Sequence, residues 1–348
     1  MKIAIIGTGI SGLSIGQMLK DHHNVTLLEN KPKIGGLIKC ERINDCLFHK
    51  VGGHVFNTKN PRVFDWFWSF FNQEEEFIRA TRNAKIYLRG QVIGYPIENF
   101  LYKLDSELVE KIIEELISIS KQQYQQPFDY SNFEAFLIGN FGETLYKLYF
   151  EPYNQKIWQT DLKEVAMEWL EGKLPMPNFN EIIRHNILRE TEGTMVHSTF
   201  YYPKNEGSQF IVNRLSNGLD IRHSYQITEM DINHQITINN DLKFDKLIFT
   251  GDIRNLPAAV DELLVNKGFD LNTLKSLKSN GTSNLFCETD DTKISWLYIP
   301  ENFTKAHRII YTGNFSPSNN RGSARKTCVV EFSGFVPYEV MVAELSLL

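Results

Sequence analysis

The chain begins with a short apolar strand that runs directly into a glycine-rich turn. The strand Ile3–Ile6 precedes the pattern Gly7-x-Gly9-x-x-Gly12, and Glu29 follows seventeen residues after the third glycine. The first glycine permits a tight turn, the second lets a pyrophosphate approach the backbone, and the third lets helix and strand pack closely. The helix N-terminus then faces the phosphates, and the acidic residue is placed to accept hydrogen bonds from ribose hydroxyls. The sequence therefore predicts a βαβ unit that binds a dinucleotide.

Composition limits what the rest of the chain can be. The 348 residues are 42% apolar and carry a formal net charge of −5, so we expect a globular protein of two or three subdomains without the basic surface of a nucleic-acid-binding protein. No apolar run approaches the roughly 20 residues of a membrane span. The four cysteines (Cys40, Cys46, Cys287 and Cys328) show neither a CxxC pair nor metal-ligand spacing. With no signal peptide before Met1, we expect four thiols, no metal site and a cytoplasmic protein, whose oligomeric state is left open between monomer and homo-oligomer.

Two further glycine pairs follow the acidic strand end. The first pair, Gly35-Gly36, lies just past Glu29 and is followed by Leu37. The second pair ends at Gly53 and is followed directly by His54. In flavoproteins, a glycine pair after the acidic strand lets the chain pass close to the cofactor, and a histidine after two glycines can approach a ring system. The alternatives are an ordinary turn and a structural histidine.

Hydrophobic periodicity and turn residues predict the elements that follow. They indicate helices over 62–78, from Asp105-Ser106 onwards, and over 132–148, 163–172 and 209–215; a hairpin over 84–93 with its turn at Arg89-Gly90; strand-like sequence over 220–250 with a turn at Asn239-Asn240; and strands over 284–288, 294–299, 308–314 and 327–332.

Five landmarks make the chain resemble the UDP-galactopyranose mutases, a family within the FAD-dependent amine-oxidase-like superfamily. They are the GTGISG loop with Glu29, the IGGL pair, VGGHVF, EPYNQKIW, and WLYIPE followed by HRIIYTGNFSP. The first two mark flavoproteins in general, whereas the last three in this order are more specific to the mutases. The resemblance extends from residue 1 to about residue 332.

The resemblance implies an isomerase that interconverts the pyranose and furanose forms of a nucleotide sugar, with UDP-galactose as the first candidate, for polysaccharide biosynthesis. FAD is the implied cofactor, active when reduced, with NADPH or NADH as the reductant, although the overall reaction is redox-neutral. N5 of the reduced flavin is the nucleophile that displaces UDP from the anomeric carbon, while the protein orients and polarises the substrate. The nucleotide sugar is therefore the expected partner, and no metal is required.

The predicted fold class is α/β: a Rossmann-like FAD-binding domain with an inserted helical subdomain and an antiparallel β-sheet substrate subdomain. The expected bounds are 1–82 and 204–283 for the discontinuous FAD-binding domain, 100–190 for the helical subdomain, and 83–99, 191–203 and 284–335 for the sheet subdomain.

The resemblance assigns roles to residues at matching positions. The residues expected to bind FAD are Gly7, Gly9, Ser11, Gly12, Glu29, Asn30, Gly35, Gly36, Leu37, Gly53 and His54. The expected catalytic residues are His54, which lies against the isoalloxazine in the family, together with Trp158 and Arg308.

The expected substrate-binding residues are Tyr95, Glu98, Asn154, Trp158, Lys173, His197, Tyr298 and Arg308. Tyr95 corresponds to the uridine-contacting segment, Asn154 and Trp158 to residues that line the sugar and the flavin face, and Tyr298 and Arg308 to the pair that holds the diphosphate. Arginine suits that task because its planar fork binds phosphate oxygens bidentately. Each position also has a structural alternative: core packing for Trp158, ring packing in a strand for Tyr298, a solvated charge for Arg308 and a turn cap for Asn154.

Three substrate positions depart from the family's pattern. Lys173 stands where many mutases have an arginine for the diphosphate, Glu98 stands where a glutamine helps to read the uracil edge, and His197 stands where an asparagine is expected. Lysine keeps the charge but loses the fork, and a carboxylate cannot donate a hydrogen bond to a carbonyl. The exact sugar and base are therefore left open.

The end of the sequence departs as well. The family continues past Phe332 with a segment that closes over the flavin, whereas this sequence ends at Leu348, so residues 336–348 are expected to be the helical start of that segment. Either the sequence is a fragment, or the protein lacks part of its flavin site and admits water there. Two alternatives to a mutase follow: an oxidase or desaturase of the same superfamily, insensitive to Arg308, and an inactive or truncated flavin-binding protein.

Overall fold

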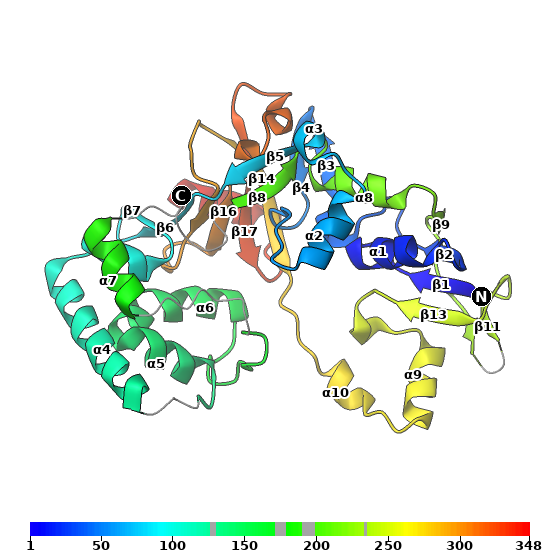
Figure 1. Cartoon of the computed structure of the whole chain (residues 1–348), viewed down its shortest axis with the longest axis horizontal. Helices are drawn as coiled ribbons and strands as arrows, with labels where there is room; N and C mark the ends of the chain where they lie inside the picture. The colour runs from blue at the N-terminus through cyan, green and yellow to red at the C-terminus, as the bar shows by residue number, and fades with distance from the viewer. Residues whose placement is uncertain (126–129, 171–178, 190–198, 233–234) are drawn as a thin grey trace. The chain divides into compact units, whose positions relative to one another are not determined.

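The chain forms two units and passes between them three times. The computed structural model describes residues 1–125, 130–170, 179–189, 199–232 and 235–348 (Figure 1). The first unit comprises Met1–Ile78 and Tyr202–Ser279, and the second comprises Arg79–Tyr201 and Asn280–Leu348. The four cysteines are free, as the sequence predicts.

A four-stranded parallel sheet forms the centre of the first unit, in the strand order β13-β1-β2-β9. Helix α1 connects β1 to β2, and Ile3, Ala4 and Ile5 of β1 are buried. A strand covered on both faces reads as a continuous apolar run, which explains why no polar residue interrupts it. The strands are β1 (Lys2–Ile6), β2 (Asn24–Leu28), β9 (Asp220–Arg222) and β13 (Lys246–Phe249), and α1 spans Ile10–Leu19.

Smaller elements complete the first unit. A three-stranded antiparallel sheet packs against the parallel one, because Ile238 and Phe244 share a buried cluster with Ala4 and Leu28. These strands are β10 (Met230–Asp231), β11 (Ile236–Ile238) and β12 (Leu242–Phe244). The remaining elements are η1 (Gly36–Ile38), β3 (Cys40–Ile43), β4 (Cys46–His49), α2 (Pro61–Trp68), α3 (Gln73–Glu76), α8 (Ser208–Ser216), η5 (Ile253–Asn255), α9 (Ala258–Asn266) and α10 (Leu271–Lys275).

A six-stranded sheet is the centre of the second unit, in the order β14-β17-β16-β15-β6-β7. Its neighbours are antiparallel except for the parallel pair β6 and β15. The predicted hairpin is β6–β7, and its turn residues Arg89 and Gly90 both have positive φ (51° and 73°), the conformation that suits a two-residue hairpin turn. The strands are β6 (Ala84–Leu88), β7 (Gln91–Gly94), β14 (Thr282–Thr289), β15 (Trp296–Tyr298), β16 (Ala306–Ile310) and β17 (Lys326–Ser333).

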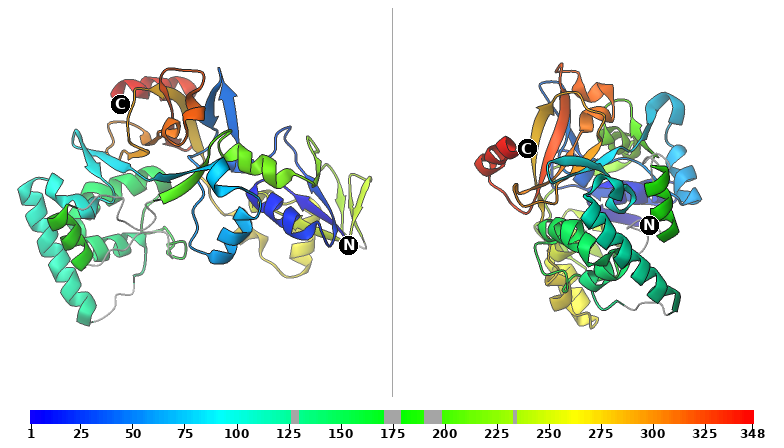
Figure 2. Two further views of the ribbon diagram at one scale, coloured as in Figure 1. Left: turned by 45° about the horizontal axis from the view of Figure 1, so that its top comes forward. Right: turned by 90° about the vertical axis from the view of Figure 1, so that its left-hand side faces the viewer.

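Helices occupy most of the remainder of the second unit. Helix α4 begins at Ser106, as predicted, buries Ile112 and Leu116, and lies beside α5 (Figures 1 and 2). The elements are η2 (Ile97–Lys103), α4 (Ser106–Gln125), α5 (Phe133–Leu145), the π-helical turn η3 (Tyr146–Phe150), α6 (Glu151–Trp158), α7 (Phe179–Leu188), η6 (Thr312–Asn314), η7 (Pro317–Asn320), α11 (Tyr338–Glu344) and η8 (Leu345–Leu347). The chain passes between the units within β5 (Phe77–Thr81), within β8 (Thr199–Pro203) and after Ser279.

The predicted helix over 62–78 is wrong in its length. The Asn60 side chain caps α2, which ends at Trp68, and the Asn72 side chain caps the short α3 before β5 begins at Phe77. The asparagine interrupts the helical pattern because its amide oxygen competes for backbone N–H groups. The aromatic residues form a cluster rather than a continuous helical face, with ring centroids 4.7 Å apart for Phe67 and Phe71.

The predicted helix over 163–172 is also not found as far as residue 170, and residues 171 and 172 lie outside the described part of the chain. Backbone hydrogen bonds here close turns of four residues, from Glu164 N–H to Asp161 O and from Leu170 N–H to Met167 O. The Asp161 carboxylate accepts a further bond from the Lys163 N–H, at 3.0 Å. The segment is therefore a series of turns.

The predicted fold class is confirmed: an α/β chain with a Rossmann-like parallel sheet, inserted helices and a largely antiparallel second sheet. The inserted helices α4 to α7 and the six-stranded sheet lie in one compact unit. The finer division of that unit into helical and sheet subdomains stays a prediction.

Candidate functional site

The glycine-rich turn connects β1 to α1 as the sequence predicts. Gly7 has φ +103°, a backbone conformation that other residues rarely adopt. A Cβ atom on Gly12 would lie 2.0 Å from the Gly7 carbonyl oxygen, so only glycine allows this approach of helix and strand. Gly9 precedes α1, and no side chain in the described part of the chain caps the helix there. The N–H groups of the first turn are therefore available to a bound phosphate.

Glu29 ties the glycine-rich turn to the loop after β2. Its side chain is 7% exposed, and its Oε2 accepts bonds from the Thr8 N–H (3.2 Å) and from the Thr8 hydroxyl. Its Oε1 accepts a bond from the Lys31 N–H at 2.9 Å. A carboxylate has further lone pairs, so these contacts leave room for the predicted bonds to a ribose, which stay a prediction.

The first glycine pair lies against the glycine-rich turn. A Cβ atom on Gly36 would be 2.9 Å from the Gly9 Cα, and the Gly35 N–H donates to the Thr8 carbonyl at 3.0 Å. The structure thus brings five predicted cofactor glycines and Glu29 into one region of the first unit. The neighbouring predicted residues Ser11, Asn30 and Leu37 are exposed.

His54 lies in the loop after β4, next to a buried histidine–tyrosine pair. Its N–H donates to His49 Nδ1 at 3.4 Å, and the two imidazole centroids are 6.4 Å apart. His49 Nε2 lies 2.7 Å from the Tyr202 hydroxyl. These contacts attach the loop that contains Gly53 and His54 to the buried pair His49 and Tyr202. The predicted contact of His54 with a flavin ring stays a prediction.

These residues fit the phosphates and ribose of a dinucleotide such as FAD. The observation that decides this is the absence of side chains at the three glycines of the turn: no side chain of the described residues caps the N-terminus of the ten-residue helix α1, and the buried Glu29 carboxylate lies beside it. Among the described residues, no group of histidine, cysteine, aspartate or glutamate side chains could hold a metal ion.

The second unit carries a charged row across three neighbouring strands. Tyr298 on β15 pairs directly with Arg308 on β16, and Arg308 pairs with Glu331 on β17. Arg308 Nε donates to Glu331 Oε2 at 2.5 Å, and Arg308 Nη2 contacts the same oxygen. The Arg308 side chain keeps 29% of its surface exposed, whereas Glu331 keeps 1%. Glu331 therefore orients the guanidinium and leaves its outer edge open to a ligand.

The pKa values of the charged row follow from burial. Burial opposes the charge of Arg308, but Glu331 more than offsets this, so the pKa of Arg308 lies above its usual range. Burial and the nearby Arg308 and Lys156 charges lower the pKa of His307 to about 3. His307 is thus neutral near pH 7 and does not compete with Arg308 for Glu331.

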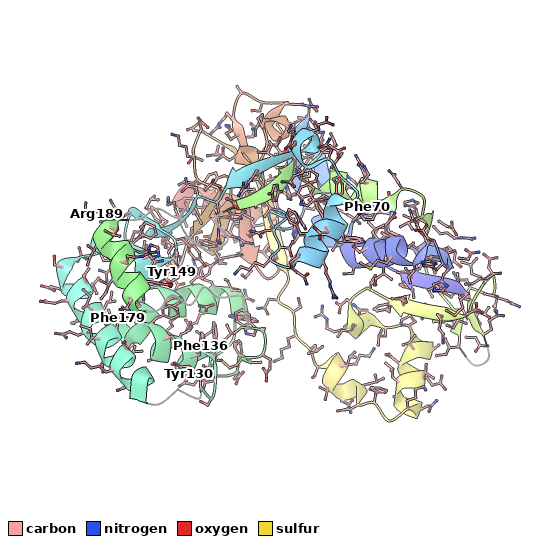
Figure 3. All side chains as sticks on the ribbon, in the orientation of Figure 1. Phe70, Tyr130, Phe136, Tyr149, Phe179 and Arg189 are labelled. Carbon is pink, nitrogen blue, oxygen red and sulfur yellow. The ribbon has the colours of Figure 1, made fainter. Side chains whose placement is uncertain are left out.

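A cluster of tyrosines continues the row. The ring centroids of Tyr95 and Tyr298 are 5.0 Å apart, those of Tyr153 and Tyr298 are 5.6 Å apart, and Tyr149 stacks on Tyr153 at 5.6 Å. Tyr149 lies in the helical part of the second unit (Figure 3). Burial raises the pKa of Tyr149 and of Tyr153 well above the usual range, so both hydroxyls keep their protons.

A second arginine reaches this cluster. Arg82 Nη2 donates to the Tyr298 hydroxyl at 2.8 Å, and its guanidinium carbon lies 4.9 Å from the Tyr95 ring centroid and 5.6 Å from that of Trp296. Stacking of this kind holds a guanidinium while its charge remains available. The cluster therefore combines aromatic surface with two arginines, a combination suited to a nucleotide diphosphate.

Glu98 lies in η2 and is 2% exposed. Burial raises the pKa of its carboxyl to about 7, so a large fraction is neutral at physiological pH. A neutral carboxyl both donates and accepts a hydrogen bond, like the glutamine expected at this position. The sequence argues against recognition of the base by Glu98, because a carboxylate cannot donate a hydrogen bond. That argument therefore applies only to the ionised form of Glu98.

Asn154 and Trp158 share one face of α6, because they are four residues apart. The Asn154 Nδ2 donates to the Phe150 carbonyl at 2.7 Å, so the side-chain amide nitrogen bonds to the backbone of its own helix. The Trp158 ring centroid is 5.1 Å from that of Trp169. Their roles beside a sugar stay predictions, and the predicted residues Lys173 and His197 lie outside the described residues.

Sequence reasoning missed four residues of this cluster: Arg82, Tyr149, Tyr153 and Glu331. One signal was present for Glu331, an acidic residue within the apolar strand sequence TCVVEF, because a buried charge needs a partner. Tyr153 belongs to the recognised segment EPYNQKIW. Tyr149 lies four residues before Tyr153, so its contact is local, whereas Arg82 carries no local signal, since only the fold brings it to Tyr298.

Comparison with known proteins first defines a broad class. A family model described as an NAD(P)-binding Rossmann-like domain matches residues 5–70, the region of the glycine-rich turn and Glu29. This part of the chain is therefore a Rossmann-like domain. No helix in the described part of the chain is both long enough and apolar enough to span a membrane.

The particular relatives are mutases. The chain is 31% identical over 187 residues to a protein named dTDP-fucopyranose mutase from Escherichia coli, covering 50% of this chain and 46% of that protein. It is 27% identical over 179 residues to a probable UDP-galactopyranose mutase from Klebsiella pneumoniae, covering 50% and 45%. The matched part thus spans about half the length of these curated relatives.

The crystal structure of a reduced UDP-galactopyranose mutase has the same fold, with a TM-score of 0.82 at 22% identity over 99% of this chain and 77% of that chain. The chain is thus a sequence and structural relative of the UDP-galactopyranose mutases, and the resemblance predicted from the sequence is confirmed. The family and the fold imply a flavin cofactor.

Proposed function

We propose that the chain is a flavin-dependent isomerase that interconverts the pyranose and furanose forms of a nucleotide sugar. The observation that carries the proposal is the row of Tyr298, Arg308 and Glu331 beside the tyrosine cluster, because it offers oriented cationic and aromatic groups to a nucleoside diphosphate. The mutase relatives support the reaction class.

Each group has a defined task in this proposal. Arg308 and the Tyr298 hydroxyl bind diphosphate oxygens and hold the leaving group as negative charge develops on it. Arg82 adds positive charge next to Tyr298, and the tyrosine rings supply surface on which a base or a sugar face can pack. Asn154 and Trp158 orient the sugar from α6.

The first unit holds FAD through the glycine-rich turn, the Gly35-Gly36 pair and Glu29, with His54 near the ring. When bound and reduced, the flavin supplies a nucleophilic nitrogen for the anomeric carbon, which explains why the described residues need no serine, histidine and aspartate triad. The preferred reductant is NADPH or NADH in this proposal.

The names of the relatives define the substrates to test. The purified chain, with its FAD content measured, is reduced with dithionite without oxygen and incubated with UDP-galactofuranose or dTDP-fucofuranose, and the products are separated by chromatography. We expect conversion of at least one furanose to the pyranose by the reduced protein only. No conversion of either, with FAD bound and reduced, would contradict the proposal, as would equal conversion by the oxidised protein.

A further inference from the structure

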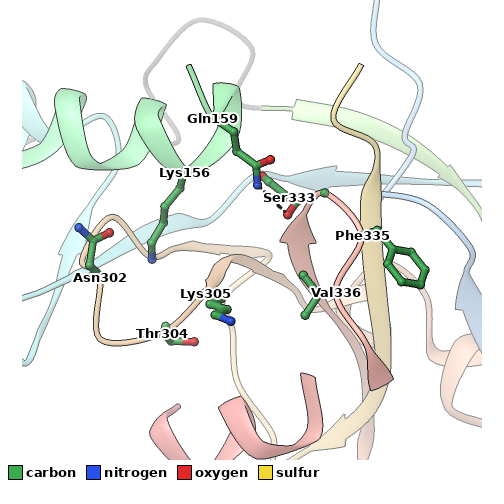
Figure 4. A pocket seen from close by; sticks show the side chains of 9 residues that line it. Lys156, Gln159, Asn302, Thr304, Lys305, Ser333, Phe335 and Val336 are labelled. Atoms are coloured by element: carbon green, nitrogen blue, oxygen red, sulfur yellow. Dashed lines mark hydrogen bonds between the residues drawn. The ribbon is translucent and has the colours of Figure 1, made fainter. Parts of the chain in front are cut away.

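Lys156 of the EPYNQKIW segment has no role in the proposed chemistry, yet its ammonium group makes three hydrogen bonds to the backbone. Its Nζ donates to the carbonyl oxygens of Ile299 (3.0 Å), Glu301 (2.5 Å) and Ala306 (3.1 Å). Three donors meet three acceptors, so the hydrogen-bonding capacity of the ammonium is used completely. Figure 4 shows the side chain extending from α6 towards the loop between β15 and β16.

The three carbonyls lie close in sequence to the two residues proposed to bind the diphosphate. Ile299 and Glu301 lie in the loop that begins directly after Tyr298, and Ala306 is the first residue of β16, two residues before Arg308. Lys156 therefore bonds to both ends of the segment that joins the two diphosphate residues. Lys156 itself lies between Asn154 and Trp158 on α6. One ammonium group thus connects the helix that carries the sugar residues to the loop that sets the diphosphate residues.

Building on the proposed function, we propose that Lys156 is a positioning residue that fixes α6 relative to Tyr298 and Arg308 and thereby sets the spacing between the sugar and diphosphate ends of the substrate site. Small misplacements of binding groups reduce rates strongly, so a loose connection would lower both substrate affinity and turnover.

Other hydrogen bonds hold the same loop, but they do not replace the bonds made by Lys156. Glu344 of α11 accepts bonds from the Thr304 hydroxyl and the Lys305 N–H, each at 2.7 Å. These contacts attach the loop to α11, whereas only Lys156, among the described residues, attaches both loop ends to α6. Lys156 and Lys305 both line a pocket of about 350 Å³ (Figure 4), and Lys305 is exposed, which makes it the matched control.

The protonation state of Lys156 provides a test that distinguishes positioning by the charged ammonium group from simple packing of the side chain. Burial lowers the pKa of Lys156 to about 8, although Glu344 and Glu301 oppose the shift. The other charged groups near it are Lys305 in the pocket and Arg308 beyond the neutral His307. Above this pH the amine keeps two N–H groups for three carbonyls, so the connection weakens as the pH rises.

The experiment compares Lys156→Met, Lys156→Arg and Lys305→Met in the FAD-bound chain. We expect Lys156→Met to weaken UDP binding by about tenfold or more, the usual effect of losing a charged hydrogen bond, and to speed amide exchange over residues 299–307. Lys156→Arg should restore affinity to within about threefold and remove the loss of affinity that the wild type shows above pH 8. Lys305→Met should match the wild type.

Several outcomes would overturn the inference. They are wild-type UDP affinity in Lys156→Met, faster exchange with no change in affinity, equal losses in Lys156→Met and Lys305→Met, or identical pH profiles for the wild type and Lys156→Arg. If Lys156→Met does not fold, the pH profile of Lys156→Arg decides. A wild-type chain that binds UDP but converts no nucleotide sugar would contradict the proposed function alone, while failure to bind UDP would contradict both.

Discussion

At the scale of single residues, Arg308 is the group on which substrate binding should depend most. Replacing Arg308 by alanine should weaken UDP binding by about 1.5–3 kcal/mol, the usual contribution of a hydrogen bond to a charged group. Calorimetric titration with UDP measures the effect. The matched control is Arg325→Ala, because Arg325 is 54% exposed and pairs with Asp290. Equal dissociation constants for the two variants would remove Arg308 from the site.

The Arg308→Ala change also leaves Glu331 buried without its cation, which costs about 3–5 kcal/mol of stability when a buried pair is broken. The double variant Arg308→Ala/Glu331→Gln removes the stranded charge. It should regain most of the lost unfolding free energy and none of the lost UDP affinity. Recovery of affinity in the double variant would show that the single variant failed through misfolding.

Glu98 makes stability depend on pH. Burial raises the pKa of its carboxyl from 4.5 to about 7, so the folded chain binds this proton more tightly than the unfolded chain does. Below about pH 4.5, Glu98 therefore makes its full contribution to the free energy of unfolding. This contribution falls as the pH rises to about 7, by roughly 3 kcal/mol in total. Urea unfolding of the wild type and Glu98→Gln at about pH 5 and pH 8 should show the difference shifting in favour of the variant at the higher pH. Glu110→Gln, at an exposed position on α4, should show no such shift, and a pH-independent difference for Glu98→Gln would contradict the prediction.

At the scale of elements, two glycines of the same helix should respond differently to alanine. A Cβ atom on Gly12 meets the Gly7 carbonyl oxygen at 2.0 Å, a backbone atom that cannot move without displacing the β1–α1 turn. A Cβ atom on Gly16 meets only the side chains of Leu219 and Leu27, at 3.1 and 3.2 Å, which can adjust. Gly12→Ala should cost about 1–3 kcal/mol and abolish FAD retention. Gly16→Ala should be much milder, because alanine favours the helix by up to about 1 kcal/mol.

Bound FAD per chain, from absorbance, and thermal unfolding measure both glycine variants. Equal FAD retention in Gly12→Ala and Gly16→Ala would show that the close approach of helix and strand is unimportant for the cofactor.

At the scale of the whole molecule, local signals predicted what is decided locally. The strand–glycine–helix unit and the hairpin turn at Arg89-Gly90 follow from backbone conformations that only certain residues adopt, so the sequence alone located them. The segment 62–78 was misjudged because its aromatic residues pack a three-dimensional cluster while Asn72 interrupts the helix. Arg82 joins the site only through the fold, which brings it to Tyr298 from a distant part of the sequence. Lys156 carries no signal in the sequence for its three carbonyl partners, which also depend on the fold.

The residues proposed to bind FAD and those proposed to bind the diphosphate lie in different units. We therefore predict that a substitution in one group impairs the binding of only one of the two ligands. The glycine-rich turn belongs to the first unit, and the row of Tyr298, Arg308 and Glu331 belongs to the second. Gly12→Ala should therefore lose FAD while keeping the dissociation constant for UDP within about threefold of the wild type, and Arg308→Ala should lose UDP affinity while keeping its FAD. Because the two residues lie in different units, the loss of UDP binding free energy in the double variant should equal the sum of the losses in the two single variants to within about 0.5 kcal/mol. The measurements are FAD content by absorbance and UDP titration of all four chains. Loss of UDP affinity in Gly12→Ala equal to that in Arg308→Ala would show instead that the flavin itself completes the diphosphate site.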